Sequence, residues 1–597
     1  MSDPSRTQAT PRAGTRPSQG DGTIRRILGL LAPHRLRLAG AAVLTVAVVV
    51  GTLLLPVLSG NAVDCVVGAG EVDFDGLAAT LARIAVTLAA TAACQWALTA
   101  LTNRLAYDAV LDLRRQAFDH LQELPLSYLD AHGRGDLASR IVTDADQLTN
   151  GLVMGLQQLP SGVLTVVVTL VFMWALNARI ALVVALLTPV SVLSARWIAT
   201  HSARHFGGQT RLRGELTSLV EETVSGKSAV ETFCVEDEVT GRFRDIDADL
   251  GREAKKAVFL SSLVNPTMRL ANSLVYAAVG IYGAFVALGG GITVGGLSAF
   301  LGYADQYAKP FNDISGVATE LQNSVACARR LFELLDVPAE EPDAARAATL
   351  VEPAGAVALE HVAFGYDPAH PVLADVDLAV RPGTRVALVG QTGCGKTTLI
   401  NLLMRFYDVD AGAVRVDGSD VRDLTRESLR AGWGMVLQDT WVRRATVREN
   451  IALGRPDATQ AEVEAAAREA FAHEFICRLP QGYDTVLDGS SSLSAGQRQL
   501  LCIARVMLAQ PAMLILDEAT SNIDTRTEVL VQRALARLMR GRTSFVVAHR
   551  LSTVRDADLI CVVAGGTIAE RGTHDELLAA GGLYAQIFEA QFKQPDE

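Results

Sequence analysis

A glycine-rich stretch in the second half of the chain has the residue types and spacing of a phosphate-binding loop. It reads GQTGCGKTT, follows the apolar run VALV and precedes a segment of helical pattern. Its residues are Gly390, Gln391, Thr392, Gly393, Cys394, Gly395, Lys396, Thr397 and Thr398. The glycines let backbone N–H groups converge on a β-phosphate, the lysine reaches the β- and γ-phosphate oxygens, and Thr397 can ligate Mg²⁺. We therefore expect nucleotide binding here.

Two carboxylates follow an apolar run further along the chain, in MLILDE at 513–518. Asp517 is predicted to hold the Mg²⁺ shell, and Glu518 is predicted to polarise an attacking water as general base. A strand that ends in Asp-Glu is by itself more often a solvated strand end. Its position downstream of the phosphate-binding loop favours the catalytic interpretation.

A second possible anion site lies at 493–497, where LSAGQ precedes another helical segment. Helix N-termini present N–H groups and a positive dipole to an anion, so Ser494, Gly496 and Gln497 have the chemistry to bind phosphate. Equally, Ser494 could simply cap the helix. One nucleotide needs only one phosphate cradle, so this motif raises a question about assembly.

The bulk properties of the chain predict more than one domain. Its 597 residues exceed what one hydrophobic core normally organises. The net charge of −11 argues against a nucleic-acid partner. The 8 cysteines show no CxxC spacing, which argues against a zinc site and a disulfide framework.

The apolar residues concentrate in the first half and predict a membrane domain. Residues 1–22 have the composition of a disordered cytosolic tail, and an interfacial helix is expected from Thr23. Residues 38–58 carry no charge and are long enough to span a bilayer. The further candidate spans are 78–102, 155–176, 180–198, 259–286 and 293–318. The distribution of arginines places both termini in the cytosol.

The two long connections between spans, 103–154 and 199–258, are charged and helix-patterned and must lie on the same side of the membrane. Each is predicted to contain a turn among acidic and small residues, at TDADQL (143–148) and at SGKSAV (225–230). Helices of this length would project from the membrane towards a cytosolic domain.

The second half alternates strand and helix patterns and predicts a parallel α/β sheet. We expect a transmembrane domain over 23–335, a polar linker over 336–355, an ATPase domain over 356–590 and a short tail over 591–597.

The ordered set of motifs resembles the half-transporters of the ABC exporter family. The set comprises Tyr366, GQTGCGKTT, Gln438 in VLQDT, LSAGQ, MLILDE, SNID at 521–524 and His549 in VVAHR. The resemblance implies an all-α six-helix transmembrane domain fused to an α/β P-loop ATPase domain, with ATP and Mg²⁺ as cofactors.

The resemblance also implies why LSAGQ is present. In this family two nucleotide-binding domains pack head to tail, so the LSAGQ of one contacts the γ-phosphate held by the other. Tyr366 would stack on adenine, and Gln438 would contact Mg²⁺ and the attacking water. His549 would hold the γ-phosphate and orient Glu518. Asp524 would communicate with the partner domain across the dimer interface. The two predicted turns fall where the family has coupling helices.

An ATP-driven exporter of a hydrophobic or amphipathic molecule, such as a drug, lipid or peptide, is the leading interpretation. A siderophore-type importer on the same fold is the alternative, and a non-transporting ATP-gated channel or sensor is disfavoured by the intact Glu518 and His549. The resemblance implies a second half-transporter in the lipid bilayer as the partner. The stretches DEATSNIDTRTE and LYAQIFEAQF resemble the catalytically intact subunit of heterodimers, which favours a heterodimer over a homodimer. The composition is typical of a bacterium, so we expect the cytoplasmic membrane.

Three features are particular to this chain. Arg443 and Arg444 follow Gln438 and could pair with acidic residues of the coupling helices or remain solvated. Cys394 lies inside the phosphate-binding loop, where we expect it to react with maleimide. The charged residues in spans five and six either line a substrate path or form a structural ion pair. They are Arg269, Asp305 and Lys309.

Overall fold

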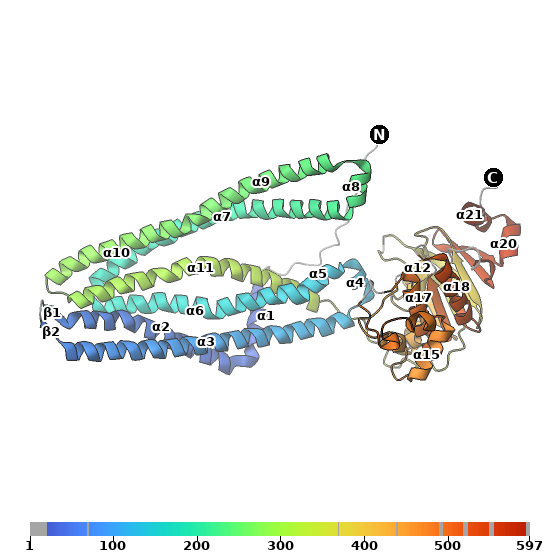
Figure 1. The fold of residues 1–597 in the computed structure, drawn as a ribbon, viewed down its shortest axis with the longest axis horizontal. Helices are drawn as coiled ribbons and strands as arrows, with labels where there is room; N and C mark the ends of the chain where they lie inside the picture. The colour runs from blue at the N-terminus through green and yellow to red at the C-terminus, as the bar shows by residue number, and fades with distance from the viewer. Residues whose placement is uncertain are drawn as a thin grey trace. The chain divides into compact units, whose positions relative to one another are not determined.

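The computed structural model describes residues 21–68, 71–367, 369–437, 440–488, 493–517, 523–547 and 554–592. They form two compact units. The first runs up to Leu124 and from His132 to Ala339, and the second comprises Pro125–Ala131 and the chain from Glu340 onwards. Figure 1 shows a helical first unit and a mixed second unit, which confirms the predicted fold class.

The first unit is built from long helices and one small hairpin. Its helices are α1 (Asp21–Leu31), α2 (Arg35–Asp64), α3 (Phe74–Glu123), α5 (Arg134–Ser139), α6 (Ala145–Leu176), α7 (Ala178–Ser225), α8 (Lys227–Phe233), α9 (Glu236–Ser262), α10 (Val264–Leu288) and α11 (Val294–Leu335). Strands β1 (Val66–Gly68) and β2 (Glu71–Val72) form the hairpin between α2 and α3. Helices α7 and α9 run side by side and are joined at one end by α8 (Figure 1).

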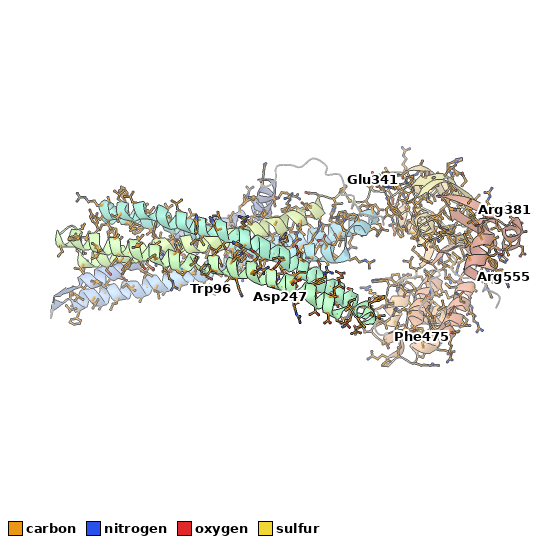
Figure 2. The ribbon with its side chains drawn as sticks, turned by 90° about the horizontal axis from the view of Figure 1, so that it is seen from above. Trp96, Asp247, Glu341, Arg381, Phe475 and Arg555 are labelled. Carbon is orange, nitrogen blue, oxygen red and sulfur yellow. The ribbon has the colours of Figure 1, made fainter. Side chains whose placement is uncertain are left out.

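Four helical segments of the described chain are long and apolar enough to cross a membrane: Gly22–Asp64, Phe74–Glu123, Arg134–Leu176 and Glu236–Leu288. The predicted spans at 180–198 and 293–318 also fall in long helices, α7 and α11. Large apolar side chains are exposed on these helices, as Trp96 of α3 illustrates (Figure 2). Contact of such apolar side chains with lipid has no free-energy penalty, whereas their contact with water is unfavourable.

The structure differs from one predicted turn. TDADQL is not a turn, because Arg140–Asp144 form a π-helical segment that continues directly into α6. The chain instead breaks at Pro125 and around Gly133, on either side of the short helix α4 (Leu126–Ala131), which clusters with the second unit. The turn predicted at SGKSAV is present, since Gly226 separates α7 from α8.

The end of α2 and the start of α11 touch through their backbones. A Cβ atom added to Gly295 would overlap the carbonyl oxygen of Gly60 and lie 2.5 Å from Asp64 Cγ. The Asp64 carboxylate accepts hydrogen bonds from the Gly295 N–H (2.7 Å) and the Thr293 hydroxyl (2.7 Å). Asp64 therefore caps a helix that begins more than two hundred residues later in the chain.

The second unit contains two sheets. Its strands are β3 (Val357–Phe364), β4 (Leu373–Val380), β5 (Arg385–Val389), β6 (Ala411–Val416), β7 (Ser419–Asp420), β8 (Trp433–Val436), β9 (Met513–Asp517), β10 (Thr543–Val547), β11 (Leu559–Ala564) and β12 (Thr567–Gly572). One sheet has the order β12-β11-β5-β10-β9-β8 and is parallel except for β12. The other has the order β4-β3-β6-β7 and is antiparallel.

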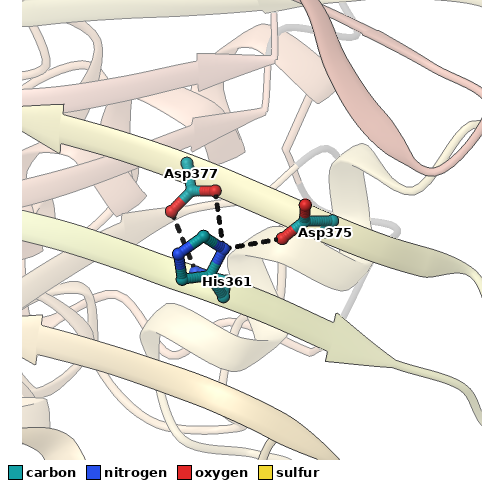
Figure 3. Close-up of side chains that lie close together, drawn as sticks. All are labelled: His361, Asp375 and Asp377. Carbon is teal, nitrogen blue, oxygen red and sulfur yellow. Dashed lines mark hydrogen bonds and ion pairs between the residues drawn. The ribbon is translucent and has the colours of Figure 1, made fainter.

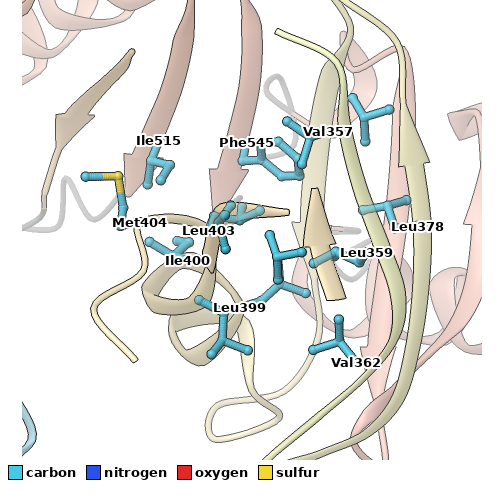
Figure 4. Close-up of a cluster of buried hydrophobic side chains, with 14 of the residues drawn as sticks. Val357, Leu359, Val362, Leu378, Leu399, Ile400, Leu403, Met404, Ile515 and Phe545 are labelled. Carbon is cyan, nitrogen blue, oxygen red and sulfur yellow. The ribbon is translucent and has the colours of Figure 1, made fainter. Parts of the chain in front are cut away.

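The helices of the second unit, besides α4, are α12 (Lys396–Leu403), α13 (Arg426–Ala431), α14 (Val447–Ala452), α15 (Gln460–Glu469), α16 (His473–Ile476), α17 (Ala495–Ala509), α18 (Thr525–Leu538), α20 (His574–Ala580) and α21 (Leu583–Phe592). Helix α12 packs between the two sheets, where Leu399 and Leu403 meet Val357 and Phe545 (Figure 4). A second core joins α14, α15, α17 and α18 to the parallel sheet. Strand β10 is buried throughout, as expected for a central parallel strand.

Candidate nucleotide-binding site

The phosphate-binding loop and Asp517 lie at one edge of the parallel sheet. The phosphate-binding loop follows β5, and Asp517 is the last residue of β9. Strand β10 lies between β5 and β9, with Val547 aligned to both Leu388 and Asp517. Asp517 is thus two strands, roughly 10 Å, from the start of the loop. The carboxyl ends of parallel strands are where such sheets bind ligands.

Three predicted residues, Gln438, Glu518 and His549, lie outside the described residues. Their positions in the chain are nevertheless informative, because Glu518 is the first residue after β9, and Gln438 and His549 are the second residues after β8 and β10. These strands are consecutive neighbours in the sheet. All three residues therefore come next in the chain after strands of the sheet that also contains β5, the strand before the phosphate-binding loop.

The loop needs glycine for two reasons. Gly393 and Gly395 have φ values of +83° and +106°, which residues with a side chain rarely adopt. At Gly390 a Cβ atom would overlap the Val563 carbonyl oxygen and lie 2.7 Å from Cys394 Sγ. The loop is consequently confined between β5, β11 and the first turn of α12.

Lys396 is held inside this loop. Its side chain is only 9% exposed, and its ammonium donates to the carbonyl oxygens of Gly390 and Gln391, each at 2.8 Å. Cys394 Sγ lies 3.6 Å from the same nitrogen. The cation is thus positioned at the centre of the loop, where a phosphate would meet it.

The next two residues face in opposite directions. Thr397 is exposed in the first turn of α12, whereas Thr398 is 5% exposed and belongs to the packed side of the helix. An exposed hydroxyl and the carboxylate of Asp517 are oxygen donors, the type that Mg²⁺ prefers. The residues present therefore fit the predicted Mg²⁺ site.

Tyr366 lies beyond the end of β3 and is 52% exposed. Its ring makes edge-on contacts with Phe364 and Tyr407, each with centroids 5.1 Å apart, and Asn401 donates to its hydroxyl at 3.3 Å. These contacts hold the ring edge-on while leaving about half of the residue exposed. An exposed, oriented ring suits the predicted stacking on adenine.

Tyr407 was not predicted from the sequence. Its hydroxyl donates to Asp130 of α4 at 2.7 Å, and burial raises its pKa well above the usual range. Tyr407 thereby joins α4 to the aromatic cluster around Tyr366. No local pattern marks this residue, because its partner is 277 positions away in the chain.

The LSAGQ motif forms a capping box at the start of α17. Ser494 Oγ accepts from the Gln497 N–H at 3.3 Å, and Gln497 Oε1 accepts from the Ser494 N–H at 3.0 Å. A hydroxyl that accepts one hydrogen bond still has its own proton to donate. Capping the helix and binding an anion are therefore compatible roles for Ser494.

Gly496 fixes the packing of this motif against α18. A Cβ atom there would overlap Thr527 Cγ2 and lie 2.9 Å from Ile523 Cγ2. Asp524 caps α18 by accepting from the Thr527 N–H at 2.9 Å, and this hydrogen bond lowers the Asp524 pKa. The two predicted signature segments are thus in direct contact.

Arg444 and two of the acids predicted to pair with it have other partners in the structure. Arg444 pairs with Asp488 at 3.1 Å. Asp144 pairs with Arg330, and Asp146 pairs with Arg114 at 2.6 Å, both inside the first unit. Of the acids considered as partners, Asp144, Asp146, Glu221 and Glu222, the first two are therefore already engaged within their own unit.

A separate polar cluster lies on the outer face of the antiparallel sheet. His361 sits at a bulge in β3, and its Nδ1 lies 3.0 Å from Asp375 Oδ1 and 3.2 Å from Asp377 Oδ2 (Figure 3). These carboxylates raise the His361 pKa. All three residues are exposed, and they belong to a different sheet from the phosphate-binding loop.

Two family models match the chain. Residues 38–311 match the ABC transporter transmembrane region, and residues 373–521 match the ABC transporter family.

Several known proteins are similar over most of their length. A fatty acid ABC transporter ATP-binding/permease protein of Mycobacterium bovis is 44% identical, over 87% of this chain and 82% of the relative. An ATP-dependent lipid A-core flippase of Syntrophus aciditrophicus is 36% identical, over 84% and 83%. The solved structure of a bacterial Atm1-family ABC exporter with ATP bound is 30% identical, covers 94% of this chain and 99% of that chain, and has a TM-score of 0.75.

Proposed function

Because the chain belongs to the ABC transporters, as a half-transporter with the exporter fold, we propose that it exports an acidic, lipid-like molecule across the bacterial cytoplasmic membrane. It binds ATP, spans the membrane and acts as a dimer, as its family does. The observation that carries the proposal is that the phosphate-binding loop and Asp517 follow or end strands β5 and β9 of one parallel sheet, with only β10 between them.

Each predicted site residue has a distinct task. Lys396 and the loop N–H groups bind the phosphates, and Tyr366 stacks on the adenine. Thr397, Asp517 and Gln438 would hold Mg²⁺, which would supply positive charge to the phosphate oxygens. Glu518 accepts a proton from the attacking water, and His549 orients Glu518 and the γ-phosphate.

The partner subunit completes the site through its own LSAGQ motif. Ser494, the Gly496 N–H and Gln497 of one chain contact the γ-phosphate held by the other, so ATP joins the two subunits. Closure of the dimer then favours an outward-facing cavity, and hydrolysis resets it. Both termini and the ATPase domain lie in the cytosol.

The names of the relatives suggest the substrate class. One is named for fatty acids and another for lipid A-core, and both kinds of molecule combine an acidic head with acyl chains. We propose a substrate of that type and a heterodimer as the working assembly.

ATP hydrolysis by the chain purified alone in lipid nanodiscs tests the proposal, with Glu518→Gln as the control. Turnover abolished by the substitution supports the activity and identifies a homodimer. Turnover that appears only with a co-expressed second half-transporter supports the activity and identifies a heterodimer. Absence of Glu518-dependent turnover in both preparations overturns the proposed function, and ATP-dependent movement of lipid towards the nucleotide-binding side overturns the direction.

A further inference from the structure

A polar cavity of about 170 Å³ lies within the first unit, between α6 and α11. Its lining residues are Gln158, Leu159, Ser161, Gly162, Thr165, Gln306, Lys309, Pro310 and Val317. Three of them, Gln158, Gln306 and Lys309, carry side-chain N–H groups that can donate hydrogen bonds. The cavity therefore has the donors that an anion needs, inside a bundle whose outer surface is largely apolar.

The cavity lies at membrane depth. Lys309 is about 22 Å along α11 from Val294, and Gln158 is about 27 Å from the end of α6 at Leu176, at 1.5 Å per residue. Both helix ends belong to the side of the bundle with short connections, and the hydrocarbon core is about 30 Å thick. A cation and two amides at this depth are costly, and such groups generally serve a function.

Each of the two helices that line the cavity contains a proline there. Pro310 lies inside α11 and Pro160 lies inside α6, next to Ser161. Proline has no N–H, so each removes the hydrogen bond to the carbonyl four residues earlier, and for Pro310 that carbonyl belongs to Gln306. The helices approach closely here, since a Cβ atom at Gly162 would lie 3.6 Å from Pro310 Cβ. The backbone is thus made locally polar on the wall of the cavity.

The ammonium of Lys309 forms an ion pair with Asp305 that another carboxylate could replace. Lys309 Nζ lies 3.0 Å from Asp305 Oδ2, one turn earlier on the same helix, and the two side chains are 58% and 65% exposed. More than half of each side chain is uncovered, so the ammonium is accessible to a second partner. The ammonium has three donors, so a second carboxylate can join Asp305 or replace it.

We propose that this cavity binds the carboxylate head group of an acyl amphiphile, with Lys309 as the charged contact and Gln158 and Gln306 as neutral donors. The volume is that of about six water molecules, which suits a head group but not an acyl chain. The chain of the ligand therefore lies outside the cavity, along the apolar bundle. This assignment deepens the proposed function and rests on it for the substrate class.

Binding of fluorescently labelled oleate to the full chain in phosphatidylcholine nanodiscs tests the assignment without requiring turnover. Lys309→Gln is expected to weaken binding about tenfold or more, because it removes a charge-assisted hydrogen bond. Lys309→Arg retains the charge and is expected to retain binding. Asp305→Asn removes the competing carboxylate and is expected to tighten binding. Methyl oleate has no anionic head and is expected to compete weakly.

Arg83→Gln provides the matched control, because Arg83 is an exposed cation on α3 that does not line the cavity. Equal affinity of the parent chain and Lys309→Gln overturns the assignment, as does competition by methyl oleate as strong as that of oleate. Because Asp305→Asn shifts affinity in the opposite direction, weaker binding in both variants signals a damaged bundle and also counts against it. Failure of the proposed function appears separately, as a lack of Glu518-dependent ATP hydrolysis in a chain that still discriminates the two lipids.

Discussion

The dual role of Ser494 makes a prediction that separates helix capping from anion binding. Its Oγ accepts from the Gln497 N–H at 3.3 Å and keeps a proton to donate. Ser494→Ala removes both functions. Loss of the cap costs about 1 kcal/mol, or about 2–4 °C in the thermal midpoint of a unit of this size. Loss of a hydrogen bond to a charged phosphate costs a further 1.5–3 kcal/mol, or roughly 10- to 100-fold in ATP hydrolysis.

Ser494→Asp separates these two effects. Aspartate is a good helix cap, so the thermal midpoint is expected to stay near that of the parent chain. It has no proton to donate and brings a negative charge towards the phosphate, so ATP hydrolysis is expected to fall at least as far as in Ser494→Ala. Thr459→Ala is the matched control, because Thr459 forms the same capping box at the start of α15, away from the nucleotide edge.

Steady-state ATP hydrolysis and thermal unfolding of the four proteins decide the matter. Thr459→Ala should lose stability and keep its activity, whereas Ser494→Asp should show the reverse. Activity of Ser494→Asp within about twofold of the parent chain would refute the reasoning that the hydroxyl donates to an anion.

The remaining predictions concern three other parts of the molecule. Maleimide is expected to abolish ATP hydrolysis by modifying Cys394, whose Sγ lies 3.6 Å from Lys396 Nζ. Bound ATP is expected to protect Cys394 from labelling. Full ATP hydrolysis after complete labelling of Cys394 would contradict this prediction. The His361 pKa is raised chiefly by its hydrogen bond to Asp375, so the stability that this bond contributes is complete below the unfolded pKa of about 6.5 and is lost as pH rises through the higher folded pKa. NMR titration of Asp375→Asn should show a lower His361 pKa than in the parent chain. An unchanged His361 pKa would show that the hydrogen bond to Asp375 does not cause the shift. Gly295→Ala should lower the free energy of unfolding of the membrane unit by about 1–3 kcal/mol, because the added methyl group overpacks the contact. Gly280→Ala is the neutral control, since its added Cβ would lie 3.9 Å from the nearest neighbouring atom. Equal melting temperatures of the two variants would count against the close contact at Gly295.

Much of the nucleotide-binding unit could be predicted from the sequence because its signals are local. The phosphate-binding loop combines a fixed glycine spacing with a preceding apolar strand, and both features lie within about a dozen residues. In the structure the loop that contains Lys396 follows β5, and Asp517 ends β9 of the same sheet. Likewise, the i,i+4 spacing of Asp305 and Lys309 is visible in the sequence and gives the observed ion pair.

The errors and omissions arise where distant partners decide the structure. TDADQL has the composition of a turn, yet Asp144 and Asp146 are paired with Arg330 and Arg114, so the segment is stable as helix. Tyr407 was overlooked because its partner is 277 residues away. Local propensity has no information about such pairs, and tertiary contacts override it.

The close approach of α2 and α11 at Gly60 and Gly295 has a consequence for how the membrane unit moves. Because backbone touches backbone and the Asp64 carboxylate bridges the gap, there is no layer of flexible side chains to absorb a small displacement. The two helix ends are expected either to stay docked or to separate completely, as a two-state contact. When they part, the N–H groups at the start of α11 lose their carboxylate and must be hydrated, so any outward opening that separates these helices admits water at this point first.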